Sequence, residues 1–194
     1  MKKGDYLSTI LRSKKTVFSF KDIVLLWGDS GNAARVRLNY YLRNNSLYHI
    51  RQGLYAKDKD YDKRELATRI YTPAYISFET VSGFSGLTFQ YYSQIFVASY
   101  LTREIEIDNQ KYSFRKIKNT VLTNKAGIEN RGEYLIASKE RAFLDIMYIN
   151  KDYYFDNLIG IDWDKVFEIL PIYNNKRMMK KVKEIFINFK NQES

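Results

Sequence analysis

The stretch from residue 29 to residue 57 constrains the fold of this chain more than any other. Its first half, residues 31–44, repeats apolar side chains at helical spacing after two residues that can cap a helix N-terminus. Two short runs of strand-forming residues, 47–50 and 54–56, then flank a turn in which Gly53 can supply a positive φ. A helix followed at once by such a hairpin is the order of a recognition helix and its wing.

Two shorter helices are predicted upstream of this stretch, at residues 4–12 and 20–27, and Ser19 is expected to cap the second of them. Three helices and a hairpin in this order predict a winged helix-turn-helix DNA-binding domain at residues 1–60. The stretch 57–63 is charged and poor in apolar residues, which is typical of a linker. We therefore expect a second domain at 61–194.

The predicted third helix has a polar side that carries arginine, asparagine and tyrosine but no carboxylate. A solvated helix face usually mixes acids with bases, whereas arginine and asparagine match the edges of guanine and adenine. The sequence therefore predicts major-groove contacts for Arg35, Arg37, Asn39, Tyr40 and Arg43. Contacts to phosphates, or to the groove beside the wing, are predicted for Lys14, Lys15, Lys21, Arg51 and Gln52.

The placement of charge supports a polyanionic partner for the first domain. The chain has a net charge of +10, of which residues 1–60 carry +7, residues 61–172 carry −1 and residues 173–194 carry +4. A basic first domain of this kind is typical of nucleic-acid binding. A lysine-rich proteome that makes many proteins basic is the alternative explanation.

Several function classes are excluded or left without support by composition. The chain has no cysteine, which excludes disulfides, thiol catalysis and zinc sites built on cysteine. His49 is the single histidine, so a site with several histidine ligands is excluded as well. We expect no cofactor and no enzymatic activity. No apolar run is long enough for a membrane span and no signal peptide is visible, so we expect a cytoplasmic protein.

The second domain is predicted to mix helices with an antiparallel sheet, which makes the whole chain an α+β protein. Three runs with a period of two, at 95–99, 103–108 and 111–117, are predicted to be antiparallel strands. Ser77 is expected to cap a short helix, and Ser138 is expected to cap a helix that ends near residue 150. Two C-terminal helices are expected after it, at 162–170 and 174–190. The last of them is basic and is either a core-packed helix with a solvated face or a second contact for DNA or a partner protein.

Two acidic patterns were weighed as metal sites. Glu104, Glu106 and Asp108 alternate along one strand and offer oxygen ligands for Mg²⁺, as in a nuclease, but an exposed strand face has the same pattern. Asp162 and Asp164 have the spacing of a nucleotidyltransferase metal pair, yet no glycine-serine phosphate loop precedes them. The sequence favours a strand surface and a helix N-terminus, respectively.

Three segments resemble markers of the AbiEi-type antitoxin family, the antitoxin halves of bacterial abortive-infection toxin–antitoxin pairs. Segment 51–55 resembles the family's wing, which has an Arg-x-Gly-x-Tyr pattern. Segment 73–80 resembles a second marker, and segment 136–145, with Glu140, Arg141 and Asp145, resembles a third. Many members of the family have a longer C-terminal region than this chain.

This resemblance implies a phage-defence antitoxin that represses its own promoter by binding an inverted repeat of double-stranded DNA, as a homodimer or cooperatively. It further implies that the second domain counteracts a nucleotidyltransferase-like toxin that acts on RNA, with direct contact left open. The alternative from another class is a protein-interaction module that neutralises a toxin by direct contact, without binding DNA. Glu140 is expected to stabilise the N-terminus of its helix, and Arg141 to pair with a nearby carboxylate, in preference to contacting the toxin.

Overall fold

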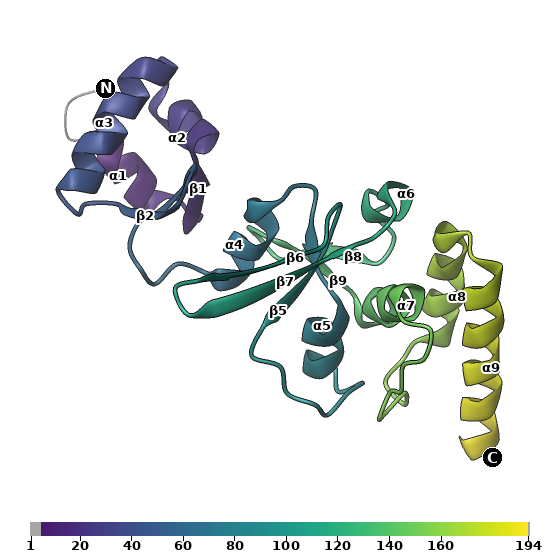
Figure 1. The fold of residues 1–194 in the computed structure, drawn as a ribbon. Helices are drawn as coiled ribbons and strands as arrows, with labels where there is room; N and C mark the ends of the chain where they lie inside the picture. The colour runs from purple at the N-terminus through teal and green to yellow at the C-terminus, as the bar shows by residue number, and fades with distance from the viewer. Residues whose placement is uncertain (1–4, 194) are drawn as a thin grey trace. The chain divides into compact units, whose positions relative to one another are not determined.

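The structure is a computed structural model that describes residues 5–193. The chain divides into two compact units between Ile70 and Tyr71 (Figure 1). The first unit thus ends about one helix later than the expected boundary at residue 60, because helix α4 (Lys63–Ile70) packs against strand β1 (Val17–Ser19). The mixed α+β class is confirmed, with helices and a sheet in each unit.

The first unit builds a small helical core against an antiparallel sheet in the order β1-β3-β2. Ile23, Trp27 and Leu38 lie at its centre and are almost fully buried. The Trp27 indole N–H donates to the carbonyl of Tyr6 at 2.9 Å, which ties α1 to α2. Besides β1 and α4, its elements are α1 (Asp5–Arg12), α2 (Phe20–Trp27), α3 (Gly31–Arg43), β2 (Tyr48–Arg51) and β3 (Leu54–Ala56).

Local sequence explains where these helices begin and end. Ser19 caps α2 and forms a capping box with Asp22, in which each side chain binds the other's backbone N–H. Gly28 ends α2 in the left-handed conformation at φ 63°, which a side chain would disfavour. Ser30 caps α3. The expected helix starts at Ser19 and at Asp29 or Ser30 are therefore confirmed.

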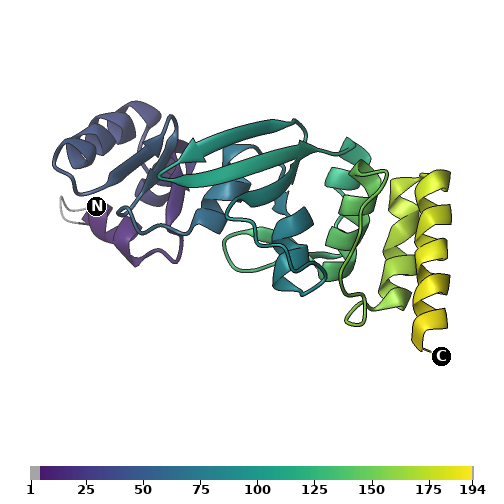
Figure 2. The ribbon, with the colours of Figure 1, turned by 60° about the horizontal axis from the view of Figure 1, so that its bottom comes forward.

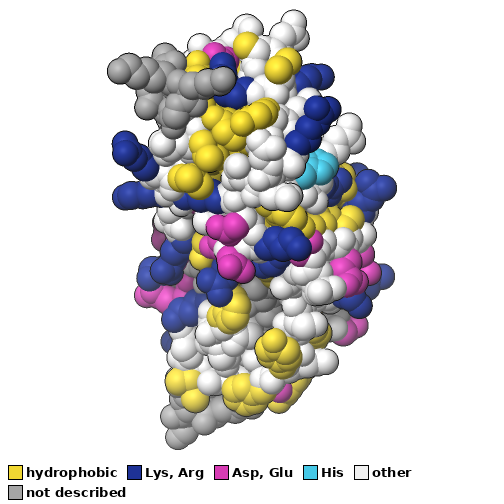
Figure 3. Space-filling view, turned by 90° about the vertical axis from the view of Figure 1, so that its left-hand side faces the viewer, with side chains coloured by type: hydrophobic (Ala, Val, Ile, Leu, Met, Phe, Trp, Pro, Cys, Tyr) yellow, Lys and Arg dark blue, Asp and Glu magenta, His cyan; other side chains and the backbone are white. Residues whose placement is uncertain are grey.

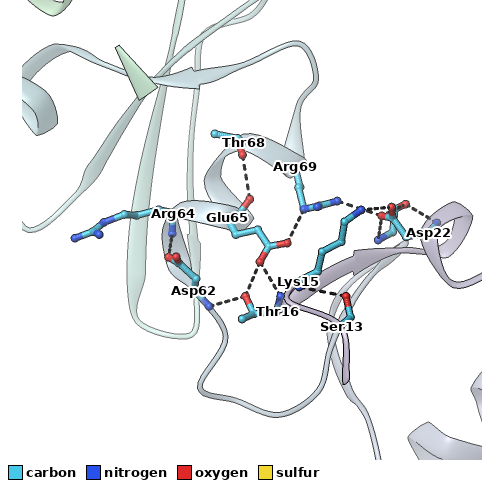
Figure 4. A network of polar contacts seen from close by, with 10 residues as sticks. Ser13, Lys15, Thr16, Asp22, Asp62, Arg64, Glu65, Thr68 and Arg69 are labelled. Carbon is cyan, nitrogen blue, oxygen red and sulfur yellow. Dashed lines mark hydrogen bonds and ion pairs between the residues drawn. The ribbon is translucent and has the colours of Figure 1, made fainter. Parts of the chain in front are cut away.

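A network of carboxylates and cations fastens α4 to the rest of the first unit (Figure 4). The Glu65 carboxylate is buried, accepts from the N–H and hydroxyl of Thr16 at 2.8 and 2.7 Å, and pairs with Arg69 at 2.9 Å. Arg69 also reaches Asp22 at 3.1 Å, and Lys15 reaches the same carboxylate at 2.9 Å. We refer to Lys15, Asp22, Glu65 and Arg69 as the α4 network.

The second unit is built on a mixed sheet in the order β6-β7-β5-β4-β9-β8. Its strands are β4 (Tyr75–Ile76), β5 (Ile95–Ser99), β6 (Arg103–Ile107), β7 (Gln110–Lys116), β8 (Ile128–Asn130) and β9 (Leu135–Ala137). Its helices are α5 (Phe78–Phe84), α6 (Asn119–Leu122), α7 (Lys139–Ile149), α8 (Trp163–Ile169), the short 3₁₀ helix η1 (Leu170–Tyr173) and α9 (Lys176–Glu193).

The prediction that the sheet is antiparallel is wrong for two pairs, because β5 and β7 run parallel and so do β4 and β9. The turn at Asp108 and Asn109, both at positive φ, joins β6 and β7 as an antiparallel hairpin, as expected. However, β7 takes the inner position because Tyr112 and Phe114 are fully buried. The charged strand β6 lies at the edge of the sheet, where its charged side chains stay in solvent without a cost in free energy.

Helices α5, α7, α8 and α9 pack together through aromatic side chains. Helix α7 contacts α5, α8 and α9, and Phe143 on it lies 4.8 Å from the ring of Phe155. Helices α8 and α9 lie side by side in both ribbon views, and Trp163 joins them through Phe186 at 5.1 Å and Phe189 at 5.6 Å (Figures 1 and 2). The two C-terminal helices expected from the sequence are confirmed.

Candidate nucleic-acid interface

The exposed side of α3 carries four of the five residues expected to read DNA. Ala34, Leu38 and Tyr41 are buried and orient the helix. The opposite side exposes Arg35, Val36, Asn39, Tyr40 and Arg43, which we call the α3 face. No carboxylate lies on this face, so its arginines have no competitor for an anion on their own helix.

Arg37 is the exception among the predicted groove residues. Its guanidinium pairs with Asp29 at 3.0 Å and lies 3.5 Å from the ring centre of Tyr6. The side chain is 27% exposed, so most of it is enclosed by these partners. Arg37 therefore holds α3 to the preceding loop and to α1, and it is not part of the α3 face.

The hairpin tip places two further candidates near the surface. Gln52 is exposed, Arg51 is half-buried, and Gly53 between the strands has φ 78° as the turn requires. The register between β2 and β3 shifts between His49 and Arg51. A shift of this kind bends a strand and changes the direction of its side chains. His49 stacks on Tyr55 at 5.4 Å between ring centres, so it serves the hairpin itself.

The three lysines expected to hold phosphate separate into two groups. Lys14 and Lys21 are exposed, whereas Lys15 belongs to the α4 network through Asp22. Burial disfavours the charged form of Asp22, but hydrogen bonds from Ser19 and Lys15 and the charge of Arg69 outweigh it and lower the pKa of Asp22 to about 2. The Lys15–Asp22 pair is therefore intact at neutral pH, and Lys15 is a structural residue.

The first unit keeps an excess of cations whether or not its internal ion pairs are counted. Residues 1–70 hold 15 Lys and Arg against 7 Asp and Glu, a net of +8. Asp22, Glu65 and Asp29 are held in ion pairs inside the unit, so their negative charge is compensated locally. Figure 3 shows lysine and arginine side chains spread over the upper part of its view.

Two residues of this surface were not among the candidates. Arg12 is exposed in the last turn of α1, two residues before Lys14. Its signal in the sequence was the run of cations at 12, 14 and 15 that follows the helix. Val36 is 73% exposed on the α3 face, where an apolar side chain suits contact with the methyl group of thymine.

The two family-like segments of the second unit meet in one buried network. The Asp145 carboxylate accepts from Ser77 at 2.7 Å, Tyr75 at 3.0 Å, Tyr173 at 2.6 Å and the Arg141 Nε at 3.3 Å. Arg141 and Asp145 have no exposed surface. Burial raises the pKa of Asp145, while the charge of Arg141 and the hydrogen bonds of the other three donors favour the ionised carboxylate. We call these five residues the Asp145 network.

Tyrosine protonation keeps the Asp145 network intact. Burial, together with the charge of Asp145, raises the pKa of Tyr75 and of Tyr173 well above the ordinary value, so both phenols remain donors. The remaining Arg141 donors reach the carbonyls of Val121 and Ala126, each at 2.7 Å. The prediction that Arg141 pairs with a nearby carboxylate is confirmed.

Ser77 and Glu140 have roles that differ from simple capping. Ser77 precedes α5 as expected, but its hydroxyl makes no cap bond and donates to Asp145 instead. Glu140 lies in the first turn of α7, is 3% exposed, and accepts from the N–H of Asp162 at 3.3 Å. Neither side chain is presented for binding a partner.

The acidic patterns considered as metal sites form strand and helix surfaces. Glu104 and Glu106 are exposed on edge strand β6. Asp162 caps α8 by accepting from the N–H of Lys165. Within residues 5–193, no group of three or more acidic or histidine side chains is arranged to hold a metal ion. No helix in that range has the length and apolar character that crossing a bilayer requires.

Comparison with known proteins adds no relative to these observations. No protein-family model matches the sequence. A search of curated proteins likewise finds no match.

Proposed function

We propose that this chain is a cytoplasmic antitoxin of the AbiEi type that represses its own promoter and counteracts a nucleotidyltransferase-like toxin. Its first unit would then be a winged helix-turn-helix domain, with α3 as the recognition helix and β2–β3 as the wing. The observation that carries the proposal is the α3 face, which exposes arginine, asparagine and tyrosine without a carboxylate.

In this proposal α3 enters the major groove of an inverted repeat. Asn39 is suited to adenine, and Arg35 and Arg43 are suited to guanine or to phosphate. Lys14, Lys21 and Arg12 are exposed on neighbouring elements and supply phosphate contacts. Gln52 and Arg51 contact DNA from the wing. Phosphate contacts set affinity and its salt dependence, and the α3 face sets specificity.

A shift assay on the chain's own promoter tests the DNA-binding half. Asn39→Ala or Arg43→Ala is expected to cost roughly 1–3 kcal/mol of binding and to relax specificity at one position. Lys14→Ala is expected to weaken binding to all sequences alike and to reduce the salt slope by about one. Arg131→Ala, which removes an exposed arginine of the second unit, is the matched control and should leave binding unchanged.

Unchanged promoter binding in both α3-face variants would show that α3 is not the reading helix. Loss of binding in the Arg131→Ala control would show a charge effect without a specific face.

The antitoxin half rests on the resemblance of segments 73–80 and 136–145 to the family. Both segments contribute to the Asp145 network, which accounts for their polar residues as parts of a core. Any contact with a toxin therefore has to use other side chains. Toxicity rescue in cells that express the neighbouring gene tests this half, with and without the first unit's Asn39→Ala change.

A contact-only antitoxin that does not bind DNA is the second candidate. It is favoured by Leu25 and Val36, which are 71% and 73% exposed on α2 and α3. Co-purification of the neighbouring gene product, lost on Leu25→Ser or Val36→Ser, would support this function if the promoter shift is absent.

A further inference from the structure

The C-terminal end of α5 and two loops of the second unit expose large apolar side chains. One loop follows α5 and the other joins α7 to α8. The side chains are each at least 70% exposed, and we call them together the aromatic surface: Phe84, Phe89, Tyr91, Tyr154 and Ile159. Isolated apolar residues are normal on a surface, but a group of this size marks a contact site.

Hydrogen bonds hold the two loops against each other. The backbone N–H groups of Asp156 and Asn157 donate to the carbonyl of Leu87 at 2.9 and 3.3 Å. The N–H of Phe89 donates to the Asp156 carboxylate at 2.8 Å. Phe155 is buried against Phe143 and anchors the second loop to α7. The exposed side chains therefore belong to one supported surface and not to two unrelated loops.

A hollow lies beside this surface, between the second loop and α9. Its volume is about 400 Å³, and Tyr154, Ile159, Ile185 and Phe189 are among the residues that line it. Figure 3 shows hydrophobic side chains gathered at the lower end of its view, with few charged ones among them. Asp156, Asn157 and Asn188 also line it, so part of the hollow is polar. A hollow next to projecting aromatic rings suits a partner surface that also has projecting side chains.

The lack of charge identifies the class of partner. From Thr80 to Thr102 the chain has no Lys, Arg, Asp or Glu, although its net charge is +10. In the second loop, the Asp156 carboxylate accepts a hydrogen bond from the N–H of Phe89. Lys151 and Asp152 are exposed earlier in the second loop, so the first loop is the part without charge. Nucleic acid requires cations along its backbone, and the first loop supplies none. Charge depletion with aromatic enrichment is instead the composition of a protein–protein contact.

The area of the aromatic surface matches one side of a stable dimer. An aromatic side chain buries about 150–250 Å² when it is covered. Five largely exposed side chains therefore offer on the order of 600–800 Å², and a standard interface buries roughly 800 Å² per partner. A second copy meets a further condition, because two chains of the same net positive charge repel each other least where the contact carries few charges.

We infer that the aromatic surface joins two copies of this chain in a two-fold symmetric pair, in which the same surface is used by both partners. Such a pair does not depend on DNA binding.

Sedimentation of the purified full chain without DNA tests the pair. The wild type is expected to form a dimer that dissociates on dilution. Replacing two highly exposed rings, Tyr91→Ser with Tyr154→Ser, is expected to raise the dimer Kd about thirtyfold or more. Leu25→Ser removes an equally exposed apolar side chain from the first unit and should leave the Kd unchanged. Unchanged thermal melting will show that each variant is folded.

A charge-exchange experiment separates a self-contact from any other use of the surface. Tyr91→Lys and Tyr91→Glu are each expected to weaken the dimer through like-charge repulsion. An equal mixture of the two should form heterodimers more tightly than either forms homodimers. A wild type that is monomeric at all concentrations, or a dimer indifferent to Tyr91 and Tyr154, overturns the inference. Since no DNA is present, neither result bears on promoter binding.

Discussion

The α4 network and the Asp145 network solve the same structural problem at different depths. Each joins elements that are far apart in the sequence through a carboxylate that serves several donors. In the α4 network Glu65 is buried, but the Asp22 and Arg69 side chains are 19% and 18% exposed, whereas Arg141 and Asp145 have no exposure at all. Depth determines how much a broken pair costs, because water can replace a lost partner only near the surface.

The largest expected effect is the loss of the carboxylate at the centre of the Asp145 network. Asp145→Ala leaves the Arg141 guanidinium buried without its counter-ion and is expected to destabilise the second unit by roughly 3–5 kcal/mol. Urea unfolding followed by circular dichroism measures the change. The control, Lys180→Ala, breaks an exposed pair with Glu184 and should have no measurable effect. A cost below that of a surface pair would mean that the network is not a unit.

Gly127 provides a second way to break the same network, through shape and not through charge. It has φ 69°, and an added Cβ would lie 2.8 Å from the Cβ of Arg141 and 2.8 Å from Ile169. Gly127→Ala combines backbone strain with overpacking and is expected to cost about 2–4 kcal/mol. Gly160→Ala is the matched control, since Gly160 has open space around it. Equal unfolding midpoints for the two variants would contradict this packing.

Breaking the α4 network should cost less stability than breaking the Asp145 network, and the cost should depend on pH. The pKa of Asp22 lies at about 2, below its ordinary 3.8, so its ion pairs and hydrogen bonds contribute about 2 kcal/mol above pH 4. This contribution falls as the pH drops toward 2, where the folded state binds the proton. Asp22→Asn should therefore destabilise the first unit at pH 7 and approach the wild type at low pH.

The comparison with Asp60→Asn separates this effect from a general change in charge. Asp60 is exposed, so its replacement should leave unfolding unchanged at every pH. A constant difference between Asp22→Asn and the wild type across the acidic range would mean that the carboxylate charge is not what holds α4.

The smallest expected effect distinguishes two arginines of one helix. Arg37→Ala removes a pair with Asp29 and the contact with Tyr6, and should cost about 1 kcal/mol of stability. Arg43→Ala, on the exposed α3 face, should change stability by less than about 0.5 kcal/mol. Thermal unfolding of both variants measures this difference. If Arg43→Ala cost more stability than Arg37→Ala, Arg37 would have to be counted as part of the α3 face.

Local signals in the sequence predicted most of the helices. Ser19, Ser30 and Ser138 cap α2, α3 and α7 as expected, because a cap depends on residues within one turn of the helix start. The α3 face was predictable from helical periodicity alone. The structural role of Arg37 was not predictable in this way. Its partners come from a loop and from α1, and a helical wheel of α3 does not include them.

Strand order was the weakest part of the prediction. The alternation of β6 and β7 is similar in sequence, yet only β7 is buried between two neighbours. Which strand lies inside depends on what covers it, and that information resides in distant helices. Ser77 shows the same limit: its position before α5 predicted a cap, but Asp145, 68 residues later, takes its hydroxyl.

The edges of the second unit's sheet determine how copies of this chain can assemble. Edge strand β6 exposes Arg103, Glu104 and Glu106, and the opposite edge strand β8 exposes Glu129 and Asn130. A further strand that added to either edge would bury charge, so the sheet is a poor template for continuous main-chain pairing. Copies of the chain would then associate through side-chain surfaces that each bind a single partner, which favours a closed assembly over a fibre.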